Sequence, residues 1–439
     1  MQQSRRNFIK STAVLSAGLA FGMNAKSYGR IIGANDRLNF AIIGLNGRAG
    51  AHLKSIGTCS NVNISHVCDV DSQVLSKFSG SVKQQFGYSA VEIKDFRKIL
   101  DDKNVDVITI ATPEHWHTPM AVMGLKAGKH VFVEKPSSHN PREGEILVEA
   151  QKKYGKLVQL GNQQRSSDFT ISIVEKIKNG LIGKPYFGKA WYCSQRKSIG
   201  VGKVIPVPDY LDWDLWQGPA PREDYKDNFH PYNWHWFQKW GTGEALNNGT
   251  HEIDICRWAL GVDYPKSVNA SGGRYHFKDD WQFYDTLVTN FEYDDKLITW
   301  EGMSCNSKQT YTGGRGSMIV GTEGTVIIHR RGYQVFDIGN KLLDELKLEN
   351  ENSTMDHLSA DSSTDAHFKN FVNGIRNGEK LHSPISEGNI SVTMLLLSNI
   401  AWKVNRTLSL DKENHRITND AEAMKHWSRE YEPGWELTI

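Results

Sequence analysis

The feature that most limits the fold of this chain is an alternation of short apolar runs with helical patterns, which begins at residue 38. Runs such as "LNFAIIGL", "VDVITIATP" and "HVFVEKP" have the length and composition of β-strands. The segments between them read as amphipathic helices, two of which end at a glycine. Strands that alternate with helices form a parallel, doubly wound sheet. The sequence therefore predicts an α/β protein.

A turn that contains glycine follows the first of these strands and precedes a helix. It reads "GLNGRAG" and begins at Gly44. A dinucleotide-binding turn has glycine at its first and third positions and glycine or alanine at its sixth. Gly44 and Ala49 match this pattern, whereas Asn46 replaces the middle glycine. Arg48, at the start of the helix, is a donor for phosphate.

An acidic residue, Asp69, ends the next strand. A carboxylate there accepts hydrogen bonds from ribose hydroxyls and repels a 2′-phosphate. The combination predicts a Rossmann domain over residues 36–165 that binds NAD in preference to NADP. A bare glycine turn with a surface aspartate is the alternative interpretation. The expected cofactor contacts in this region are Gly44, Asn46, Gly47, Arg48, Ala49 and Asp69.

Two more strand ends carry polar groups. In "ATPEHWH", Thr112 and Pro113 bend the chain across the sheet edge where a dinucleotide would lie, and His117 opens the next helix. The following strand ends in "EKP", so it presents Lys135 at its carboxyl end. Ligands of an open α/β sheet lie beyond the carboxyl ends of its strands. We therefore expect Lys135 beside the nicotinamide, where its amine can hydrogen-bond a substrate hydroxyl and favour the alkoxide. A solvent-exposed lysine at a strand end is the alternative.

The chain changes character after residue 165. Its strands become longer and alternate between apolar and polar residues, and "EYDDK" and "VGTEGTV" read as hairpin turns. These features predict a second domain over residues 166–439, built on a large, mostly antiparallel open sheet.

One helical segment of this second domain places polar groups on a single face. Asn247, His251, Asp254 and Trp258 follow the spacing of an α-helix. Buried polar groups cost free energy unless they are paired. His251 is therefore either a satisfied core histidine or a proton acceptor directed at the substrate.

These motifs, in this order, resemble the glucose–fructose oxidoreductase/inositol dehydrogenase (Gfo/Idh/MocA) family. The resemblance runs from "FAIIGLNGRAG" through "ATPEHWH" and "AGKHVFVEKP" to "GTHEIDICRWALG" and "IVGTEGTV". It implies a Rossmann domain followed by an α/β domain whose open sheet often mediates oligomers. It also implies NAD(P) as the cofactor and sugars or polyols as substrates.

The resemblance also implies roles for particular residues. The catalytic lysine of the family falls on Lys135, with Glu134 beside the cofactor and a cis peptide bond before the proline. The family's Asp-x-x-x-His pair falls on Asn247 and His251, so asparagine replaces the aspartate in this chain. An amide still binds a sugar hydroxyl but holds no charge beside the histidine. His251 remains the expected acid/base partner of Lys135.

Aromatic residues point to a carbohydrate substrate. Most of the 13 tryptophans lie between residues 191 and 300. The C–H faces of sugars pack on indole rings, and the indole N–H bonds to hydroxyls. The expected substrate contacts are Trp234, His235 and Trp236 of "NWHWF", Gln163 and Arg165 at the end of the last Rossmann strand, and Asn247 and His251 on the helix.

The first 30 residues have the form of a twin-arginine export signal. Arg5 and Arg6 precede Phe8 and Lys10, and a short apolar run follows. A chance basic N-terminus is the alternative. The signal predicts export of the folded protein to the periplasm. No NAD pool exists there, so we expect a tightly bound cofactor.

Composition gives no indication of a nucleic acid, membrane or metal partner. The formal net charge is +2, which favours no polyanion such as nucleic acid. No later segment is long and apolar enough to predict a membrane span. Five cysteines at wide spacings indicate neither a disulfide framework nor a zinc site, so we expect no metal.

The sequence thus predicts an NAD-dependent oxidoreductase that transfers a hydride to or from a sugar or glycoside. We expect a dimer or tetramer formed through the C-terminal sheet. One alternative is an NAD-dependent glycoside hydrolase, in which oxidation is followed by elimination. Another is a non-catalytic sugar-binding protein with the same fold.

Overall fold

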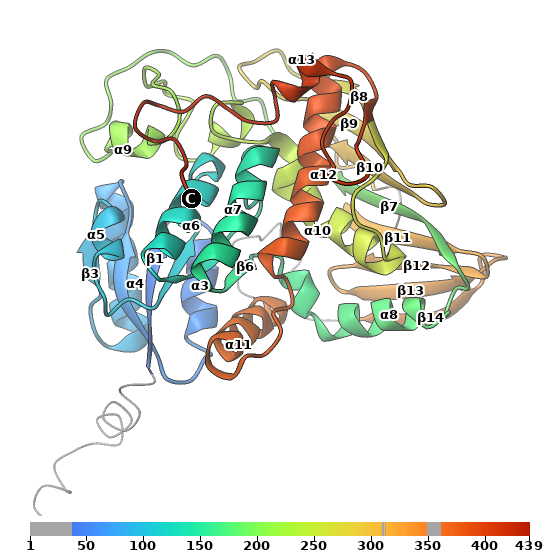
Figure 1. Ribbon diagram of the computed structural model, residues 1–439, viewed down its shortest axis with the longest axis horizontal. Coiled ribbons are helices and arrows are strands. Elements are labelled where there is room, and N and C mark those ends of the chain that lie inside the picture. Colours follow the sequence, from blue (N-terminus) through green and yellow to red (C-terminus); the bar gives the residue numbers. More distant parts are fainter. Residues whose placement is uncertain (1–36, 310, 312, 349–360) are drawn as a thin grey trace, which may run out of the picture.

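The computed structural model describes residues 37–309, 311, 313–348 and 361–439. The predicted export signal at residues 1–30 lies outside the described residues. Two sheets organise the chain, with helices packed between and around them (Figure 1). This arrangement confirms the predicted α/β class and the pairing of a Rossmann sheet with a mostly antiparallel one.

The first sheet has six parallel strands in the order β3-β2-β1-β4-β5-β6. The two central strands β1 and β4 pair in register from Phe40 and Val107 onward. Apolar side chains cover both faces of β4, which is fully buried, as the continuous apolar run predicts. The strands are β1 (Leu38–Ile43), β2 (Val62–Cys68), β3 (Val91–Ile93), β4 (Val107–Ile110), β5 (His130–Val133) and β6 (Val158–Leu160).

Helices connect these strands. Asn140 caps the start of α7 by accepting a hydrogen bond from the Glu143 N–H, and Gly155 ends that helix in the left-handed conformation. The helices of this part are α3 (Ala49–Ile56), α4 (Ser72–Phe86), α5 (Arg97–Leu100), η2 (Glu114–Trp116), α6 (His117–Lys126), α7 (Pro141–Tyr154) and η3 (Gln163–Ser166).

The second sheet has nine strands in the order β14-β13-β12-β11-β7-β10-β9-β8-β15. All its pairs are antiparallel except β7 with β10. Both predicted hairpins are confirmed, because β9 pairs with β10 and β11 with β12. The strands are β7 (Pro185–Cys193), β8 (Ser267–Gly273), β9 (Thr286–Glu292), β10 (Leu297–Met303), β11 (Arg315–Gly321), β12 (Gly324–His329), β13 (Gly332–Asp337), β14 (Leu342–Lys347) and β15 (Leu408–Ser409).

Helix α10 (Gly243–Leu260) covers one face of this sheet and is buried along almost its whole length. It contacts β7, β10 and β11 on one side and α12 on the other. The remaining helices are α8 (Asp168–Lys178), α9 (Trp213–Gln217), η4 (Asn233–Trp236), α11 (Ser362–Asn377), α12 (Ile385–Val404) and α13 (Ala421–Met424). Among the residues that the structure describes, no helix has both the length and the apolar character to cross a bilayer.

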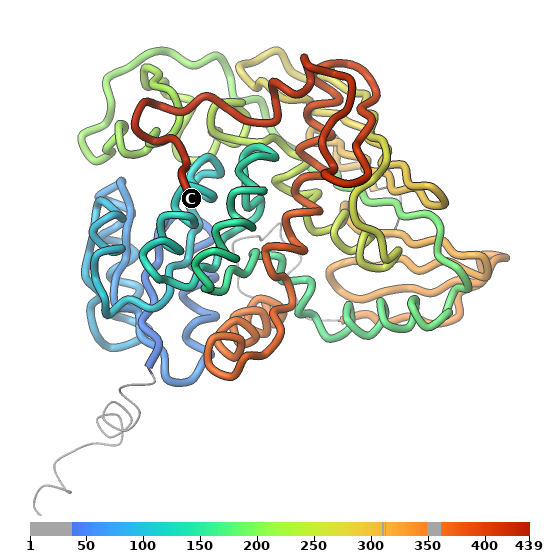
Figure 2. The backbone as a smooth tube through the Cα atoms, in the orientation of Figure 1, coloured from blue at the N-terminus to red at the C-terminus, as the bar shows by residue number. Residues whose placement is uncertain are grey.

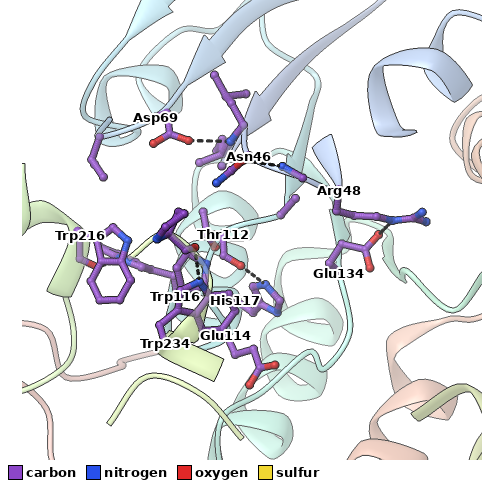
Figure 3. A pocket seen from close by; sticks show the side chains of 18 of the residues that line it. Asn46, Arg48, Asp69, Thr112, Glu114, Trp116, His117, Glu134, Trp216 and Trp234 are labelled. Carbon is purple, nitrogen blue, oxygen red and sulfur yellow. Dashed lines mark hydrogen bonds and ion pairs between the residues drawn. The ribbon is translucent and has the colours of Figure 1, made fainter. Parts of the chain in front are cut away.

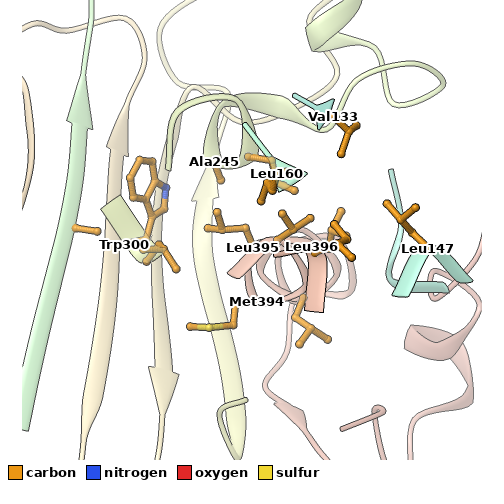
Figure 4. Packing of buried hydrophobic residues seen from close by; sticks show 14 of the residues in the cluster. Val133, Leu147, Leu160, Ala245, Trp300, Met394, Leu395 and Leu396 are labelled. Atoms are coloured by element: carbon orange, nitrogen blue, oxygen red, sulfur yellow. The ribbon is translucent and has the colours of Figure 1, made fainter. Parts of the chain in front are cut away.

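Helix α12 joins the two domains. It packs against β6 and α7 of the Rossmann domain and against α10 and β8 of the second domain. In Figure 4, Leu395 and Leu396 of α12 lie between Trp300 of the antiparallel sheet and Leu147 of α7, with Leu160 of the parallel sheet next to them. One continuous apolar core therefore spans both domains, and it holds their facing surfaces together.

The C-terminal residues also return to the Rossmann domain, although the sequence assigns them to the second. The tail crosses over α6 and α7 (Figure 2), where Arg429 bonds to Glu143 at 2.8 Å. Trp435 meets Trp116 edge to face. Helix α11 packs on α3, and its Phe368 stacks on Phe132 of β5 with ring centroids 4.2 Å apart. The Rossmann core is thus completed by residues from the far end of the chain.

We expect a Phe368→Ala variant to lose about 3–5 kcal/mol in free energy of unfolding, because Phe368 is fully buried and its removal leaves a cavity in the Rossmann core. Urea titration followed by tryptophan fluorescence measures the change. Tyr275→Ala is the control, since that side chain is 73% exposed. Equal losses in the two variants would contradict the packing described for α11.

Candidate active site

A cavity of about 470 Å³ lies at the carboxyl edge of the parallel sheet, between the two domains. Residues that follow β1, β2, β4 and β5 form one wall, and residues of α9, η4 and α10 form the other. Figure 3 shows the Arg48–Glu134 pair on one side of this cavity and Trp216 on the other. All the predicted cofactor contacts except Ala49 line it.

The turn after β1 has the shape that a dinucleotide requires. Gly44 adopts a φ of 79°, in the left-handed region, and a Cβ there would lie 2.6 Å from the Thr112 backbone nitrogen. Only glycine fits at this point. The Asn46 side chain folds back and accepts a hydrogen bond from the Gly47 N–H at 3.0 Å. Ala49 is fully buried at the start of α3, where a small residue lets the helix approach the sheet.

Asp69 connects this turn with the next strand end. One carboxylate oxygen accepts from the Leu45 N–H at 2.7 Å, and the other accepts from the Asp71 N–H at 2.9 Å. Burial raises the pKa of Asp69 to about 6. Each oxygen keeps acceptor capacity for a ribose hydroxyl.

Two buried polar atoms in the cavity wall have no hydrogen-bond partner among the described residues, namely Thr112 Oγ1 and Gln163 Oε1. Buried polar groups are normally satisfied. Together with the turn at Gly44 and the carboxylate of Asp69, they fit a bound nicotinamide dinucleotide.

Arg48 was expected to contact phosphate, and the structure places its guanidinium on Glu134, 2.7 Å from Oε1. His52 Nε2 lies 2.9 Å from the same oxygen. Burial alone would raise the pKa of Glu134, but Arg48 and His52 outweigh it and hold that pKa well below its usual range. Glu134 is therefore a carboxylate whose charge Arg48 already compensates.

The ammonium of Lys135 reaches across the domain boundary. Its Nζ donates to the backbone carbonyl of Asn247 and lies 3.4 Å from the Asn247 Oδ1. The Lys135–Pro136 bond is cis, as the family resemblance implies. Burial lowers the pKa of Lys135 to about 8, with Glu134 and Glu114 acting in the opposite direction. An amine with this pKa exchanges protons near neutral pH.

His251 lines the same cavity as Lys135. Its Nδ1 lies 2.6 Å from the Asn162 Oδ1, an oxygen that only accepts, so Nδ1 carries the proton and Nε2 is the basic nitrogen. Burial, followed by the charges of Lys135 and Arg315, lowers the pKa of His251 well below its ordinary value. The imidazole is therefore a neutral acceptor.

Three predicted contacts have a different role in the structure. Trp236 is 1% exposed, stacks on Trp281 in the core, and does not line the cavity that Trp234 and His235 line. Arg165 forms an ion pair with Asp254, with Nε 2.5 Å from the carboxylate, and does not line the cavity. His117 does line it, but both its ring nitrogens face backbone carbonyls.

Sequence reasoning missed most of the wall that faces the glycine turn. Trp216 of α9 and His230 and Tyr232 of the loop before η4 line the cavity, and all three belong to the segment 194–242 between β7 and α10. This stretch is attached to the Rossmann domain directly after Asp69, where the Asp212 N–H donates to the Val70 carbonyl at 3.0 Å. Its density of tryptophans was the available signal. Sequence reasoning also missed Glu114 and Asn162, which stand beside residues that it did select.

No grouping of histidine, cysteine, aspartate and glutamate side chains in the described part of the chain is suited to hold a metal ion.

Comparison with known proteins identifies the family. A family model described as an oxidoreductase family with an NAD-binding Rossmann fold matches residues 38–162. The C-terminal domain model of the same family matches residues 171–327. The chain belongs to the Gfo/Idh/MocA family. Its first domain is accordingly an NAD-binding Rossmann domain of an oxidoreductase, in agreement with the geometry at Gly44 and Asp69.

Curated proteins similar to this chain include a glycosyl hydrolase and a dehydrogenase. A glycosyl hydrolase family 109 protein of Saccharopolyspora erythraea is 30% identical over 222 residues, which are 46% of this chain and 48% of the relative. An inositol 2-dehydrogenase of Salmonella paratyphi B is 29% identical over 231 residues, or 52% of this chain and 56% of the relative. The chain thus matches about half the length of these relatives.

Solved structures share the fold over most of the chain. The WlbA dehydrogenase of Bordetella pertussis, in complex with NADH and UDP-GlcNAcA, superposes with a TM-score of 0.63 at 18% identity. The match covers 86% of this chain and 100% of that one. At this level of identity the likeness establishes the two-domain Gfo/Idh/MocA fold.

Proposed function

We propose that this protein is an NAD-dependent oxidoreductase that acts on a hydroxyl or ketone of a carbohydrate. The observation that carries the proposal is that Lys135 from the Rossmann domain and His251 from the second domain line the same cavity as the dinucleotide-binding turn. A proton-exchanging amine and a neutral imidazole at one site are suited to the removal of a hydroxyl proton.

The residues of the chain have distinct tasks in this reaction. A bound nicotinamide dinucleotide supplies the hydride acceptor or donor. Gly44 and Asp69 would hold it, together with the unpartnered Thr112 hydroxyl. The Lys135 amine receives the proton of the substrate hydroxyl, and Asn247 positions that amine through its backbone carbonyl. The Asn162 amide orients His251 so that Nε2 is the nitrogen able to accept a proton.

A carbohydrate is favoured by the lining of the cavity and by the names of the relatives. Trp234 and His235 stack with ring centroids 3.5 Å apart and line the cavity beside Tyr232. Aromatic faces next to polar groups suit the C–H faces and hydroxyls of a sugar. Inositol and amino-sugar derivatives appear in the names of the relatives.

Tight retention of the cofactor is part of the proposal. The segment 194–242 bonds to Val70 through Asp212, and its Trp216 lines the cavity. Movement of this segment would therefore limit the release of the cofactor. The twin-arginine motif at Arg5 and Arg6 supports export to the periplasm. Cell fractionation of the full-length protein tests this location, and cytoplasmic retention would refute it.

The outer face of the second sheet supports the proposal of a homo-oligomer. Phe187, Val320 and Phe336 lie on this face through the strand registers, are only partly buried, and continue toward Val288, which is 44% exposed. An apolar sheet face of this kind is typical of a contact between subunits. Light scattering of the purified protein measures the number of subunits, and a monomer would refute the proposal.

Protein purified without added nucleotide is expected to carry NAD(H) in close to equimolar amount. Denaturation followed by chromatography identifies and quantifies the nucleotide. Sugars and glycosides are then added while the absorbance of reduced nicotinamide is followed, and a competent substrate changes it within one turnover. Protein that carries no nucleotide and binds none would contradict the proposal and favour a sugar-binding role without catalysis.

Glycoside hydrolysis is the second candidate, because several relatives are named as glycosyl hydrolase family 109 proteins. In such a reaction, transient oxidation of one sugar carbon acidifies the neighbouring C–H, and elimination releases the aglycone. Release of aglycone from a chromogenic glycoside, with no second substrate and no net change in nicotinamide, would decide for this candidate.

A further inference from the structure

Two side chains of opposite charge in the cavity wall stand out because neither has an ion-pair partner among the described residues. Glu114 is 2% exposed, and its Oε2 accepts a hydrogen bond from the Thr242 hydroxyl at 2.5 Å. Lys135 donates to the neutral carbonyl of Asn247. Both groups line the cavity.

The fold places these two groups at neighbouring strand ends. Glu114 follows β4 and Lys135 follows β5, and these strands pair in parallel. At the carboxyl ends of β4 and β5, the Glu134 N–H donates to the Ile110 carbonyl at 3.0 Å. The second domain fastens the Glu114 turn, since the His115 N–H donates to the Trp240 carbonyl at 3.1 Å.

The other charged groups that act on Glu114 or Lys135 have ion pairs of their own. Glu134 is bonded to Arg48. Glu244, which lies near Glu114 on α10, forms an ion pair with Arg196 at 2.7 Å.

Arg315, which lowers the pKa of Lys135, pairs with Glu252 at 2.6 Å. Among these interacting groups, the carboxylate of Glu114 and the ammonium of Lys135 are the two charges without an ion pair to the described residues, and Asp69, the other unpaired carboxylate of the cavity wall, is held by backbone N–H groups. A buried charge without a counter-charge is expensive, and an opposite charge nearby offsets that cost.

We propose that Glu114 is the electrostatic partner of Lys135, and that its carboxylate sets the pH at which the lysine amine becomes able to accept the proton of a substrate hydroxyl. The role of the amine in turnover rests on the proposed function, whereas the pairing of the two charges does not. Asn247 is neutral, so the position four residues before His251 supplies no such charge. Glu114 provides it from the Rossmann domain.

The titration of the two groups agrees with this pairing. Burial raises the pKa of Glu114 to about 7, and the Thr242 hydrogen bond and the charge of Lys135 limit the rise. Burial lowers the pKa of Lys135 to about 8. The two groups therefore exchange protons over adjoining pH ranges, so the charge of one affects the titration of the other.

The neighbouring charged groups shift the pKa values of Glu114 and Lys135 in different directions. Glu244 raises the pKa of Glu114, and the Tyr284 phenol lies close enough to interact with it. Glu134 acts on Lys135 more strongly than Glu114 does. Its effect is opposed by Arg48, which holds it, and by Arg315.

The decisive experiment measures the protonation of Lys135 directly in the protein with its bound nucleotide. Lysines are isotope-labelled at Cε, and NMR signals are followed against pH; the Lys135 signal is the one absent from a Lys135→Met variant. In Glu114→Gln the titration midpoint of Lys135 is expected to fall by about one pH unit, because loss of the carboxylate removes support for the ammonium form. The pH midpoint of kcat/KM for oxidation is expected to move in the same direction.

Two further variants complete the test. Thr242→Val removes the hydroxyl donor, which raises the pKa of Glu114, makes it less charged near neutral pH, and moves the Lys135 midpoint the same way by a smaller amount. Glu301→Gln is the control, since that carboxylate pairs with Lys189 on the outer face of the sheet. It is expected to leave the midpoint of Lys135 in place.

Each outcome is informative. A Lys135 midpoint that stays unchanged in both Glu114→Gln and Thr242→Val overturns the proposal. A lower rate at every pH with no movement of the midpoint assigns Glu114 a purely structural role and overturns it as well. A shifted midpoint in a protein that turns over no sugar supports the pairing and refutes only the proposed function.

Discussion

A Lys135→Met variant is expected to turn over its substrate about 10²- to 10⁴-fold more slowly while retaining its bound nucleotide. The loss has this size because general acid–base groups contribute rate factors in that range. Methionine keeps an unbranched chain of similar length in the buried site but has no proton to exchange. Single-turnover reduction of the bound nicotinamide, compared with nucleotide content, separates the two effects.

The control for this variant is Lys189→Met, which removes a partly buried lysine that lies on the outer face of the sheet and does not line the cavity. Its turnover is expected to match that of the unmodified protein. If Lys135→Met keeps full turnover, the amine does not act in the reaction and the roles assigned to the cavity are wrong. If it loses its nucleotide, Lys135 serves binding instead.

A Gly44→Ala variant is expected to bind NAD roughly tenfold to a hundredfold more weakly. Each 1.4 kcal/mol corresponds to about a factor of ten in affinity, so this weakening requires the displaced turn to cost binding about 1.4–2.8 kcal/mol. The new Cβ would lie 2.6 Å from the Thr112 nitrogen and 2.8 Å from the Ala111 oxygen. These are backbone atoms, so the strand end that lines the cavity has to shift. Titration of nucleotide-free protein with NAD measures the affinity.

The chain offers a matched control in Gly128→Ala. Gly128 has a φ of 77°, close to the 79° of Gly44, but a Cβ there would meet no atom within 4 Å. It ends the segment before β5 and does not line the cavity. The control variant therefore has the same backbone strain but no close contact with backbone atoms, and its NAD affinity is expected to be unchanged. Equal weakening in both variants would show that strain alone, rather than the contact with Thr112, determines the effect.

The arrangement of charges explains why a lysine at the end of β5 is suited to chemistry. Glu134, the neighbour of Lys135 in sequence, forms an ion pair with Arg48, and this pair compensates most of its charge. Glu114 comes from the adjacent strand end and lacks an ion pair among the described residues. The amine is thus buried, weakly compensated and able to titrate near neutral pH.

Much of the fold and part of the site follow from local sequence. The Rossmann sheet could be predicted because the pattern of a few consecutive residues identifies each strand and helix. Both hairpins were recognised for the same reason. Gly44, Asp69 and Lys135 were found because each stands at the carboxyl end of a strand, where the topology of a parallel sheet brings ligands. The structure gathers all three around one cavity.

The pairings within the site could not be predicted in the same way. The sequence suggested that Arg165 donates to a substrate hydroxyl, but in the structure it pairs with Asp254 of α10. It also suggested that Trp236 lines the pocket, but Trp236 stacks on Trp281. Phe368, far along the chain, completes the core beneath β5.

Sequence alone determined the order of the elements and the chemical groups at the strand ends, because backbone propensity and periodicity act between near neighbours. Only the tertiary structure decided which acid faces Lys135, which amide orients His251 and which tryptophans remain in the cavity wall. Burial and the charge of a neighbour set the state of each of these groups, and that neighbour comes from the other domain or from the next strand.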